Sequence, residues 1–211
     1  PRHENLMSNL RFRDYYKRRL PHIQIPGATY FVTFRLKDSL PLEIVEQLAK
    51  ETEQIKNLPL ELREIEHRRW FGRFDDILDR CLSGEKFLAN GQARAIVVDS
   101  LRRRDGQVYE LLAYCIMPNH VHVVFTPLEK PDRSYHSLTE ILHSLKRNSA
   151  KQANLSLGHT GPFWQDESYD HFIRDESELN RIIKYILHNP VKAGLVPEWT
   201  DWPGSYSKFP Y

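Results

Sequence analysis

The sequence predicts an α+β fold in which an antiparallel β-sheet is covered by helices. Segments 29–36, 108–117 and 120–126 combine aromatic and β-branched residues with the alternation of a strand. The second and third segments are separated only by Pro118 and Asn119, and a connection this short joins antiparallel strands. Helical periodicity occupies the stretches between and after these strands.

Length and composition agree with one medium-sized domain. The chain has 211 residues, of which 40% are hydrophobic and 27% charged, and this is enough apolar material for a core. No stretch approaches the ~20 apolar residues that span a bilayer, and the N-terminus lacks the apolar core of a signal peptide. Two cysteines do not make a disulfide scaffold, so we expect a cytoplasmic protein. We expect a single domain over residues 1–211 that includes a basic N-terminal segment (1–28), a charged insertion (59–84) and a C-terminal tail (190–211).

The first half of the chain is expected to hold one strand and several helices. After strand 29–36, a helix opens at Pro41, which suits a first helical turn, and Pro59 follows its end. Segment 59–84 is dense in charges of both signs and is expected to be partly helical. An amphipathic helix then follows Asn90.

The second half is expected to continue with the strand pair and two further helices. Leucine and isoleucine at helical spacing predict a helix over 137–153, and 169–174 reads as a short strand. Asp175 starts the last helix with Glu178 as a capping-box partner, and Pro190 is expected to end it. The order β-α-β-β-α-β, with an enlarged first crossover and an extra C-terminal helix, is that of a ferredoxin-like sheet.

Two histidines on one strand are the first candidates for chemistry. His120 and His122 alternate with Val121, so both imidazoles project from one face of the strand, ~6.6 Å apart at the backbone. Two such imidazoles can hold one divalent metal ion. A His-x-His pair on a strand is by itself a weak signal, since it is often structural.

The last predicted helix supplies a second candidate pair. Tyr185 lies at the edge of its apolar stripe, and Asn189 follows one helical turn later on the same face. A tyrosine at such an edge is usually a packing residue with a solvated hydroxyl. The amide oxygen of Asn189 would suit a divalent ion that is also held by two imidazoles.

These residues resemble a known family. The run Pro118-Asn119-His120-Val121-His122-Val123-Val124 is similar to the HUH motif of single-tyrosine transposases, where U is a bulky hydrophobic residue. Segments 161–165, 169–174 and 185–195, and Arg18-Arg19-Leu20-Pro21-His22 near the start, resemble further parts of the branch called REP-associated tyrosine transposases. The similarity spans roughly residues 15–207, while the charged insertion departs from the smallest family members.

The resemblance implies a fold, an activity and a cofactor. Tyr185 would be the nucleophile that cleaves single-stranded DNA and forms a 5′-phosphotyrosine link, which a 3′-hydroxyl could reverse. His120, His122 and Asn189 would bind Mg²⁺ or Mn²⁺. Because the unperturbed pKa of tyrosine is near 10, the phenol needs a nearby cation or base to react at neutral pH. The implied DNA partner is a short imperfect hairpin (a REP-like palindrome) with a flanking single strand, and the choice between monomer and homodimer stays open.

Basic residues interleaved with aromatics suggest where DNA would bind. The net charge is only +2, but cations cluster near the N-terminus and in the helix over 137–153. Such clusters neutralise phosphates, and aromatics stack on bases, although each residue alone is most often an ordinary surface charge. The candidates are Arg11, Arg13, Tyr16, Lys17, Arg18, Arg19, Lys146, Arg147 and Lys151.

Other interpretations of the histidine pair fit less well. A histidine-triad nucleotide hydrolase needs a third histidine at position 124, where this chain has valine, and a cupin-like site needs ligands that Glu129 alone does not supply. A structural zinc site prefers thiolates, and Cys115 is expected on another strand. The remaining alternative is a DNA-hairpin-binding protein with a retired active site. Tyr169 and Tyr206 are other possible nucleophiles, but neither has an amide one turn later on a helix.

Overall fold

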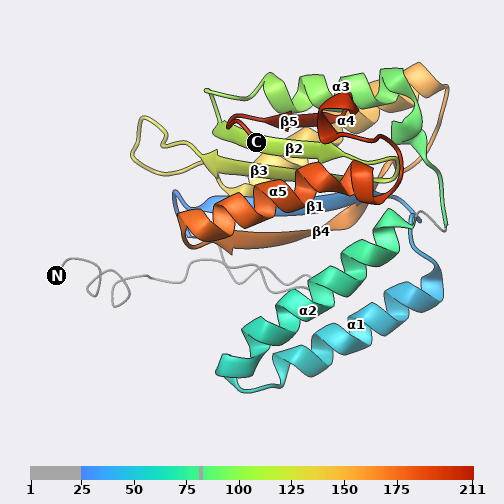
Figure 1. The fold of residues 1–211 in the computed structure, drawn as a ribbon. Coiled ribbons are helices and arrows are strands. Elements are labelled where there is room, and N and C mark those ends of the chain that lie inside the picture. The colour runs from blue at the N-terminus through green and yellow to red at the C-terminus, as the bar shows by residue number, and fades with distance from the viewer. Residues whose placement is uncertain (1–24, 81–82) are drawn as a thin grey trace.

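The computed structural model describes residues 25–80 and 83–211, which form a five-stranded sheet with helices on both faces and a helical hairpin at one edge (Figure 1). In these ranges, no helix combines the length and the apolar content needed to span a bilayer. The elements in chain order are β1 (Thr29–Leu36), α1 (Leu42–Lys56), α2 (Leu60–Asp79), η1 (Phe87–Ala89), α3 (Gly91–Arg102), β2 (Tyr109–Ile116), β3 (His120–Pro127), α4 (Leu138–Leu157), β4 (Trp164–Ile173), α5 (Glu176–Lys192), η2 (Trp199–Asp201) and β5 (Ser205–Ser207).

The sheet has the strand order β4-β1-β3-β2-β5, and every neighbouring pair is antiparallel. The first four strands in this order give the arrangement expected of a ferredoxin-like β-α-β-β-α-β chain, with α1, α2 and α3 filling the enlarged first crossover. The predicted α+β fold is therefore confirmed. The short edge strand β5, which pairs with β2, was not predicted, because three residues carry too little alternation to indicate a strand.

The two faces of the sheet are covered by different helices (Figure 1). On one face, the alternate residues Val32 and Phe34 of β1 and Val121 and Val123 of β3 pack with the apolar stripes of α3 and α4. On the other face, apolar residues of β1, β2 and β3 pack against Ile183, Ile186 and Leu187 of α5. Because side chains alternate along β3, its histidines lie on the face covered by α5.

The charged insertion forms the regular helix α2, which pairs with α1 in a hairpin beside β4 (Figure 1). The expectation of a partly helical segment understated this helix, which has 20 residues. Trp70, Phe74 and Leu78 recur every four residues and form a buried stripe against Leu48 and Ile55 of α1. The indole nitrogen of Trp70 donates to the Leu48 carbonyl at 3.3 Å. The apolar stripe, and not the exposed charges, therefore determines the position of α2.

The predicted end of the last helix at Pro190 was wrong, since α5 continues to Lys192 with the proline inside it. Proline lacks only its own N–H donor, and in the last turn of a helix this loss affects a single backbone bond. The backbone N–H of Ala193 still reaches the Asn189 carbonyl at 2.9 Å, and that of Leu195 reaches the Pro190 carbonyl at 2.9 Å. At the other end, Asp175 caps the helix by accepting a bond from the Glu178 N–H at 2.8 Å. The second half of the predicted capping box is absent, since the Glu178 carboxylate accepts from the Arg174 N–H at 3.0 Å.

The predicted boundaries of α4 and β4 were too narrow. Helix α4 extends to Leu157, and Gly158 ends it in the left-handed conformation at a φ of 62°. Strand β4 begins at Trp164, which pairs with Leu36 across an irregularity in the β1–β4 ladder. Helix α4 opens with a capping box between Ser137 and Glu140.

Candidate metal and tyrosine site

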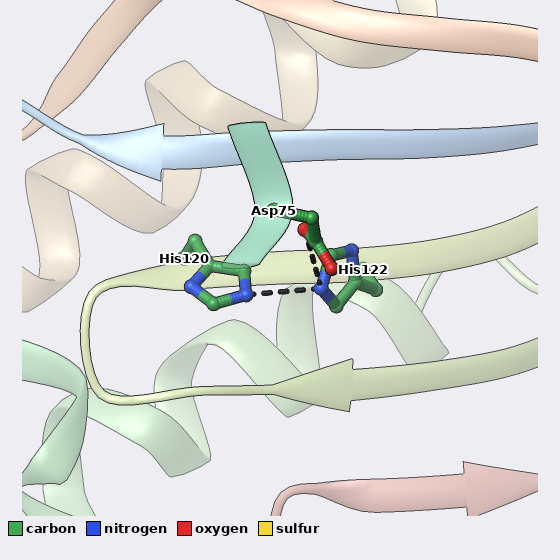
Figure 2. A group of neighbouring side chains, drawn as sticks. All are labelled: Asp75, His120 and His122. Carbon is green, nitrogen blue, oxygen red and sulfur yellow. Dashed lines mark hydrogen bonds and ion pairs between the residues drawn. The ribbon is translucent and has the colours of Figure 1, made fainter. Parts of the chain in front are cut away.

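His120 and His122 lie side by side on β3, and neither side chain is exposed to solvent. Their Nε2 atoms face each other at 2.9 Å, and the two rings are nearly perpendicular (Figure 2). The strand therefore brings the two imidazoles together as its alternation predicted.

Each ring has a hydrogen bond at Nδ1, and for His120 this bond determines which nitrogen is free. The Asn119 side-chain amide donates from Nδ2 to the Leu78 carbonyl at 3.0 Å, so its Oδ1 is the acceptor that faces His120 Nδ1 at 2.7 Å. His120 Nδ1 consequently carries the proton, and its Nε2 presents a lone pair. His122 Nδ1 bonds the Thr33 hydroxyl at 2.8 Å. Burial lowers the pKa of both histidines to about 3, so both rings are neutral at physiological pH.

Asp75 of α2 reaches the same point from outside the sheet (Figure 2). Its Oδ1 lies 3.3 Å from His122 Nε2, and the three potential ligand atoms of Asp75, His120 and His122 are all within 4.8 Å of one another. Asp79, one helical turn later, places Oδ1 3.7 Å from His120 Nε2. Burial raises the pKa of Asp75, and burial together with the neighbouring Asp75 charge raises the pKa of Asp79 to about 7.

The geometry of this cluster fits a divalent cation. In an octahedral site with bonds of ~2.1 Å, neighbouring ligand atoms are roughly 3.0 Å apart. The separations of 2.9 Å between the two Nε2 atoms and 3.3 Å between Asp75 and His122 agree with neighbouring positions. Among the described residues, Asp75 Oδ1 and Asp79 Oδ1 are buried without a hydrogen-bond partner, and a bound cation would satisfy them. One carboxylate and two imidazoles are a donor set that can hold a divalent metal ion.

Tyr185 of α5 joins the cluster through Asp75. Its hydroxyl donates a hydrogen bond to Asp75 Oδ2, and its ring centroid lies 6.4 Å from that of His122. The residue is half-buried. Burial, followed by the Asp75 charge, raises the pKa of Tyr185 well above its ordinary value. The phenol is therefore protonated unless positive charge is placed beside it.

The other two polar residues of α5 have different surroundings. Asn189 is buried, and neither atom of its amide has a hydrogen-bond partner within residues 25–80 and 83–211. Its role as an ion ligand stays a prediction. Lys192 pairs with Asp76 at 2.5 Å and with Asp79 at 3.3 Å. Burial alone would lower the Lys192 pKa, but these carboxylates outweigh it and raise the pKa. Lys192 thus attaches the end of α5 to α2.

The two alternative tyrosines lie elsewhere. Tyr169 of β4 stacks on Phe71 of α2 at 4.0 Å between ring centroids, and burial raises its pKa. Tyr206 of β5 stacks on Tyr114 at 5.4 Å, on the opposite edge of the sheet from β4. Among the described residues, Tyr185 is the tyrosine whose hydroxyl forms a hydrogen bond with the cluster of Asp75, His120 and His122.

The predicted DNA contacts are placed only in part. Arg11, Arg13, Tyr16, Lys17, Arg18 and Arg19 lie outside the described residues. Lys146 and Arg147 of α4 line a cavity of about 430 Å³ beside the start of β4, and Lys151 is exposed on the same helix. The Lys146 ammonium donates to the carbonyls of Gln165, Asp166 and Glu167 at 2.9, 3.1 and 3.4 Å. Lys146 therefore holds β4 against α4, and the proposed role of all three residues in DNA binding stays a prediction.

Asp75 was not among the residues selected from the sequence. It lies on a different element from the histidines, and only the tertiary fold brings α2 to β3. One signal was available, since Asp75 and Asp79 are spaced i, i+4 beside the apolar stripe and so project from one side of a helix. That spacing alone does not separate a ligand pair from a solvated acidic face.

Comparison with known proteins identifies relatives of this chain. The family model described as "Transposase IS200 like" matches residues 95–189, a stretch that contains His120, His122, Tyr185 and Asn189 but not Asp75. Two curated relatives carry the names "Putative REP-associated tyrosine transposase" and "REP-associated tyrosine transposase". One, from Haemophilus influenzae, is 31% identical over 106 residues, which are 48% of this chain and 59% of the relative. The other, from Escherichia coli K12, is 31% identical over 97 residues, which are 46% of this chain and 53% of the relative. The match thus spans little more than half the length of each relative.

A solved structure of a REP-associated tyrosine transposase bound to a REP hairpin shares the fold. It aligns with 91% of this chain and 81% of its own chain, at a TM-score of 0.50 and 21% sequence identity. With the family model and the two curated relatives, this confirms the resemblance of the chain to the REP-associated tyrosine transposases.

Proposed function

We propose that this protein is a metal-dependent DNA strand transferase that cleaves single-stranded DNA beside a hairpin through Tyr185. One observation carries the proposal: the Tyr185 hydroxyl and two buried, neutral imidazoles converge on the single carboxylate of Asp75. A nucleophile beside a cation site is the arrangement that phosphoryl transfer requires.

The divalent ion, Mg²⁺ or Mn²⁺, would be held by His120, His122 and Asp75. Each offers a buried ligand atom, and the hydrogen bonds that the rings form with Thr33 and Asn119 orient them. When bound, the ion would supply the positive charge that polarises the scissile phosphate and lowers the pKa of the tyrosine. Asn189 is a further candidate ligand, because its buried amide has no partner in the described part of the chain.

The chemical step follows from the position of the phenol. Asp75 Oδ2 accepts the Tyr185 hydroxyl proton in the hydrogen bond that the two residues form. As a bond forms between the phenolic oxygen and phosphorus, the bond between phosphorus and the 3′-oxygen breaks, and the 3′-oxygen takes up a proton. The product is a 5′-phosphotyrosine link and a free 3′-hydroxyl. Attack by a 3′-hydroxyl on the same phosphorus rejoins a strand without an external energy source.

The proposed partner is a DNA hairpin with a flanking single strand. The solved structure that shares the fold holds a REP hairpin, and the predicted contacts of this chain are the cations of the N-terminal segment and of α4. Stems would be bound through phosphates, and flanking bases by stacking.

A covalent adduct tests the proposal. Labelled oligonucleotides that carry imperfect hairpins with flanking single strands are incubated with the protein and Mg²⁺, and the mixture is separated in SDS. We expect a labelled protein band that disappears with chelator, with Tyr185→Phe and with His120→Ala. Tyr206→Phe is the matched control and should retain the band, because Tyr206 lies on a distant edge strand.

Two outcomes would contradict the proposal. An adduct that persists in Tyr185→Phe would show that another residue is the nucleophile. Hairpin binding by the wild type without any adduct, in the presence of either metal, would favour the alternative of a DNA-hairpin-binding protein with a retired active site.

A further inference from the structure

Arg35 of β1 is a buried cation next to the candidate site. Its side chain is 9% exposed, and it is the only arginine or lysine that is buried among residues 25–80 and 83–211. Burying a charged group is costly unless the group is paired with an opposite charge and hydrogen-bonded. The partners of Arg35 therefore decide whether it has a structural role.

The hydrogen-bond partners of Arg35 are too few to compensate its charge. One guanidinium nitrogen donates to the Ser39 hydroxyl at 3.2 Å, although a guanidinium has five N–H donors. No carboxylate of the described residues forms an ion pair with it. Burial lowers the pKa of Arg35, while the more distant charges of Glu167 and Asp38 oppose this shift. An incompletely paired buried cation is a candidate for binding an anion.

A cavity lies against this guanidinium. Its volume is about 60 Å³, and its lining includes Arg35, the carboxylic acid Glu167 and the hydroxyl residues Thr33, Thr52, Ser168 and Tyr169. The opposite wall is formed by apolar residues of the α1–α2 hairpin, among them Trp70 and Phe74. A single water needs ~10–15 Å³ on this measure, so the space suits a few waters or one phosphate-sized group.

The sheet register places the cavity beside the imidazole pair. Arg35 is paired with His120, and Thr33 with His122, between the adjacent strands β1 and β3. Directly paired residues project from the same face of a sheet, with Cβ atoms about 5 Å apart. Thr33 both lines the cavity and bonds His122 Nδ1, and Phe74 of the opposite wall immediately precedes Asp75.

The charges around the candidate site favour such a role. Asp75, Asp76 and Asp79 of α2 are acidic, and Lys192 is already paired with the last two. Both histidines are neutral. A DNA strand that enters this acidic region needs a cation to hold its phosphates beside the reacting one.

We propose that Arg35 and its cavity bind a backbone phosphate of the DNA strand, next to the phosphate that Tyr185 attacks. This inference rests on the proposed function, since it requires a DNA strand at the histidine and tyrosine centre. The guanidinium donates its remaining N–H groups to the non-bridging phosphate oxygens. Arg35 positions the strand and takes no part in bond breaking.

The main experiment is a double-mutant cycle that combines one change in the protein with one change in the DNA and measures only binding affinity. The experiment uses Tyr185→Phe protein, which should bind the DNA without cleaving it. This protein is titrated with hairpin oligonucleotides in which each phosphate that flanks the cleavage position is replaced in turn by a neutral methylphosphonate. We expect one replacement to weaken binding about tenfold when Arg35 is present and not at all in Arg35→Met. A plot of the logarithm of the binding constant against the logarithm of the salt concentration should have a slope that is shallower by ~0.7 for Arg35→Met.

The exposed Arg69 on α2 provides a matched control, because its side chain is 66% exposed and pairs with Glu66. In Arg69→Met, the methylphosphonate should weaken DNA binding by the same tenfold as in the protein that has both arginines. If the loss of affinity caused by Arg35→Met simply adds to the loss caused by each methylphosphonate, Arg35 does not contact a phosphate and the proposal is overturned.

Stability and free phosphate complete the test. Arg35→Met should keep or raise the midpoint of thermal unfolding. If Arg35 were structural, the substitution would lower this midpoint together with the affinity for every oligonucleotide, and that result would overturn the proposal.

Inorganic phosphate at matched ionic strength should raise the midpoint of thermal unfolding of the wild type but not of Arg35→Met. Equal shifts in both would exclude an anion site at Arg35. A shift specific to the wild type, combined with an additive cycle, would indicate a site for free phosphate and contradict DNA binding. Failure of the proposed function would instead appear as a wild type without adduct while the binding cycle still holds.

Discussion

The hydroxyl of Tyr185 donates a hydrogen bond to Asp75, which lies 110 residues earlier in the chain. This contact joins α5, which carries the proposed nucleophile, to α2, which belongs to the charged insertion. Asp75 also faces His122 at 3.3 Å. The insertion therefore completes the candidate site, although the matched family region begins after it, at residue 95.

Asp75→Asn should weaken binding of Mn²⁺ by at least ~10-fold, because it removes a negative ligand from the proposed ion site. Isothermal titration of the purified protein with Mn²⁺, without DNA, measures this directly. Asp76→Asn is the matched control, since Asp76 is the adjacent residue on α2, is exposed and pairs with Lys192. Equal affinities for Mn²⁺ in the Asp75→Asn and wild-type proteins would remove Asp75 from the ion site.

His120→Asn should become less destabilising as the pH falls, when both proteins are measured with chelator. The pKa of His120 is lowered from 6.5 to about 3 in the folded state. Below pH 6.5 the unfolded chain therefore binds a proton that the folded chain does not, and the wild type loses stability as the pH falls from 6.5 towards 3. Between pH 7 and pH 5, the difference in free energy of unfolding between wild type and variant should shrink by ~2 kcal/mol.

Urea unfolding at several pH values measures this difference. The same substitution at His188, whose side chain is exposed on α5, controls for the loss of an imidazole at the surface. A His120→Asn deficit that stays constant from pH 7 to pH 5 would mean that the histidine pair is not held in its neutral form.

Lys192→Gln should lower the free energy of unfolding by ~1–2 kcal/mol, because it leaves the nearly buried Asp79 carboxylate without its cation. Lys208→Gln breaks an ion pair with Glu110 in which both side chains are about half exposed, and it should cost less than Lys192→Gln because water screens the pair. Urea unfolding of the two variants compares them. Equal losses would show that the attachment of α5 to α2 contributes no more than a surface ion pair.

Gly84→Ala should be more destabilising than Gly106→Ala, although both glycines have φ values just above 70°. An added Cβ at Gly84 would lie 2.4 Å from the Asp38 carbonyl oxygen, at the point where the chain enters and leaves the α1–α2 hairpin, whereas nothing lies within 4 Å of a Cβ at Gly106. We expect a loss of ~1 kcal/mol at Gly106 and at least ~2 kcal/mol at Gly84. Thermal unfolding checks the order, and a larger loss at Gly106 would contradict it.

Much of the fold could be predicted because the relevant signals are local. Alternation along 29–36 and 120–126 separated the two faces of the sheet, and the two-residue connection before His120 required an antiparallel pair. The same alternation placed both histidines on one face, and helical spacing placed Tyr185 and Asn189 on one side of the last helix. These inferences need only the periods of strands and helices.

The parts that could not be predicted depend on contacts between distant segments. Charges on the exposed side of α2 concealed the stripe of Trp70, Phe74 and Leu78, so the insertion was not recognised as one long helix. Without the position of α2, nothing in the sequence placed Asp75 next to His122. Pro190 was expected to end the last helix, because the residue before a proline avoids the helical conformation. The helix instead continues to Lys192, and its last turn is held by backbone bonds that no sequence period indicates.

The most direct test of the proposed chemistry is to locate the DNA on the protein by mass spectrometry. Wild-type protein is incubated with hairpin oligonucleotide and Mg²⁺, digested with nuclease and protease, and the peptide that carries a residual nucleotide is sequenced by fragmentation. The proposal predicts a 5′-phosphonucleotide on the phenolic oxygen of Tyr185. A nucleotide attached to any other residue, or cleaved DNA without a covalent peptide, would contradict it.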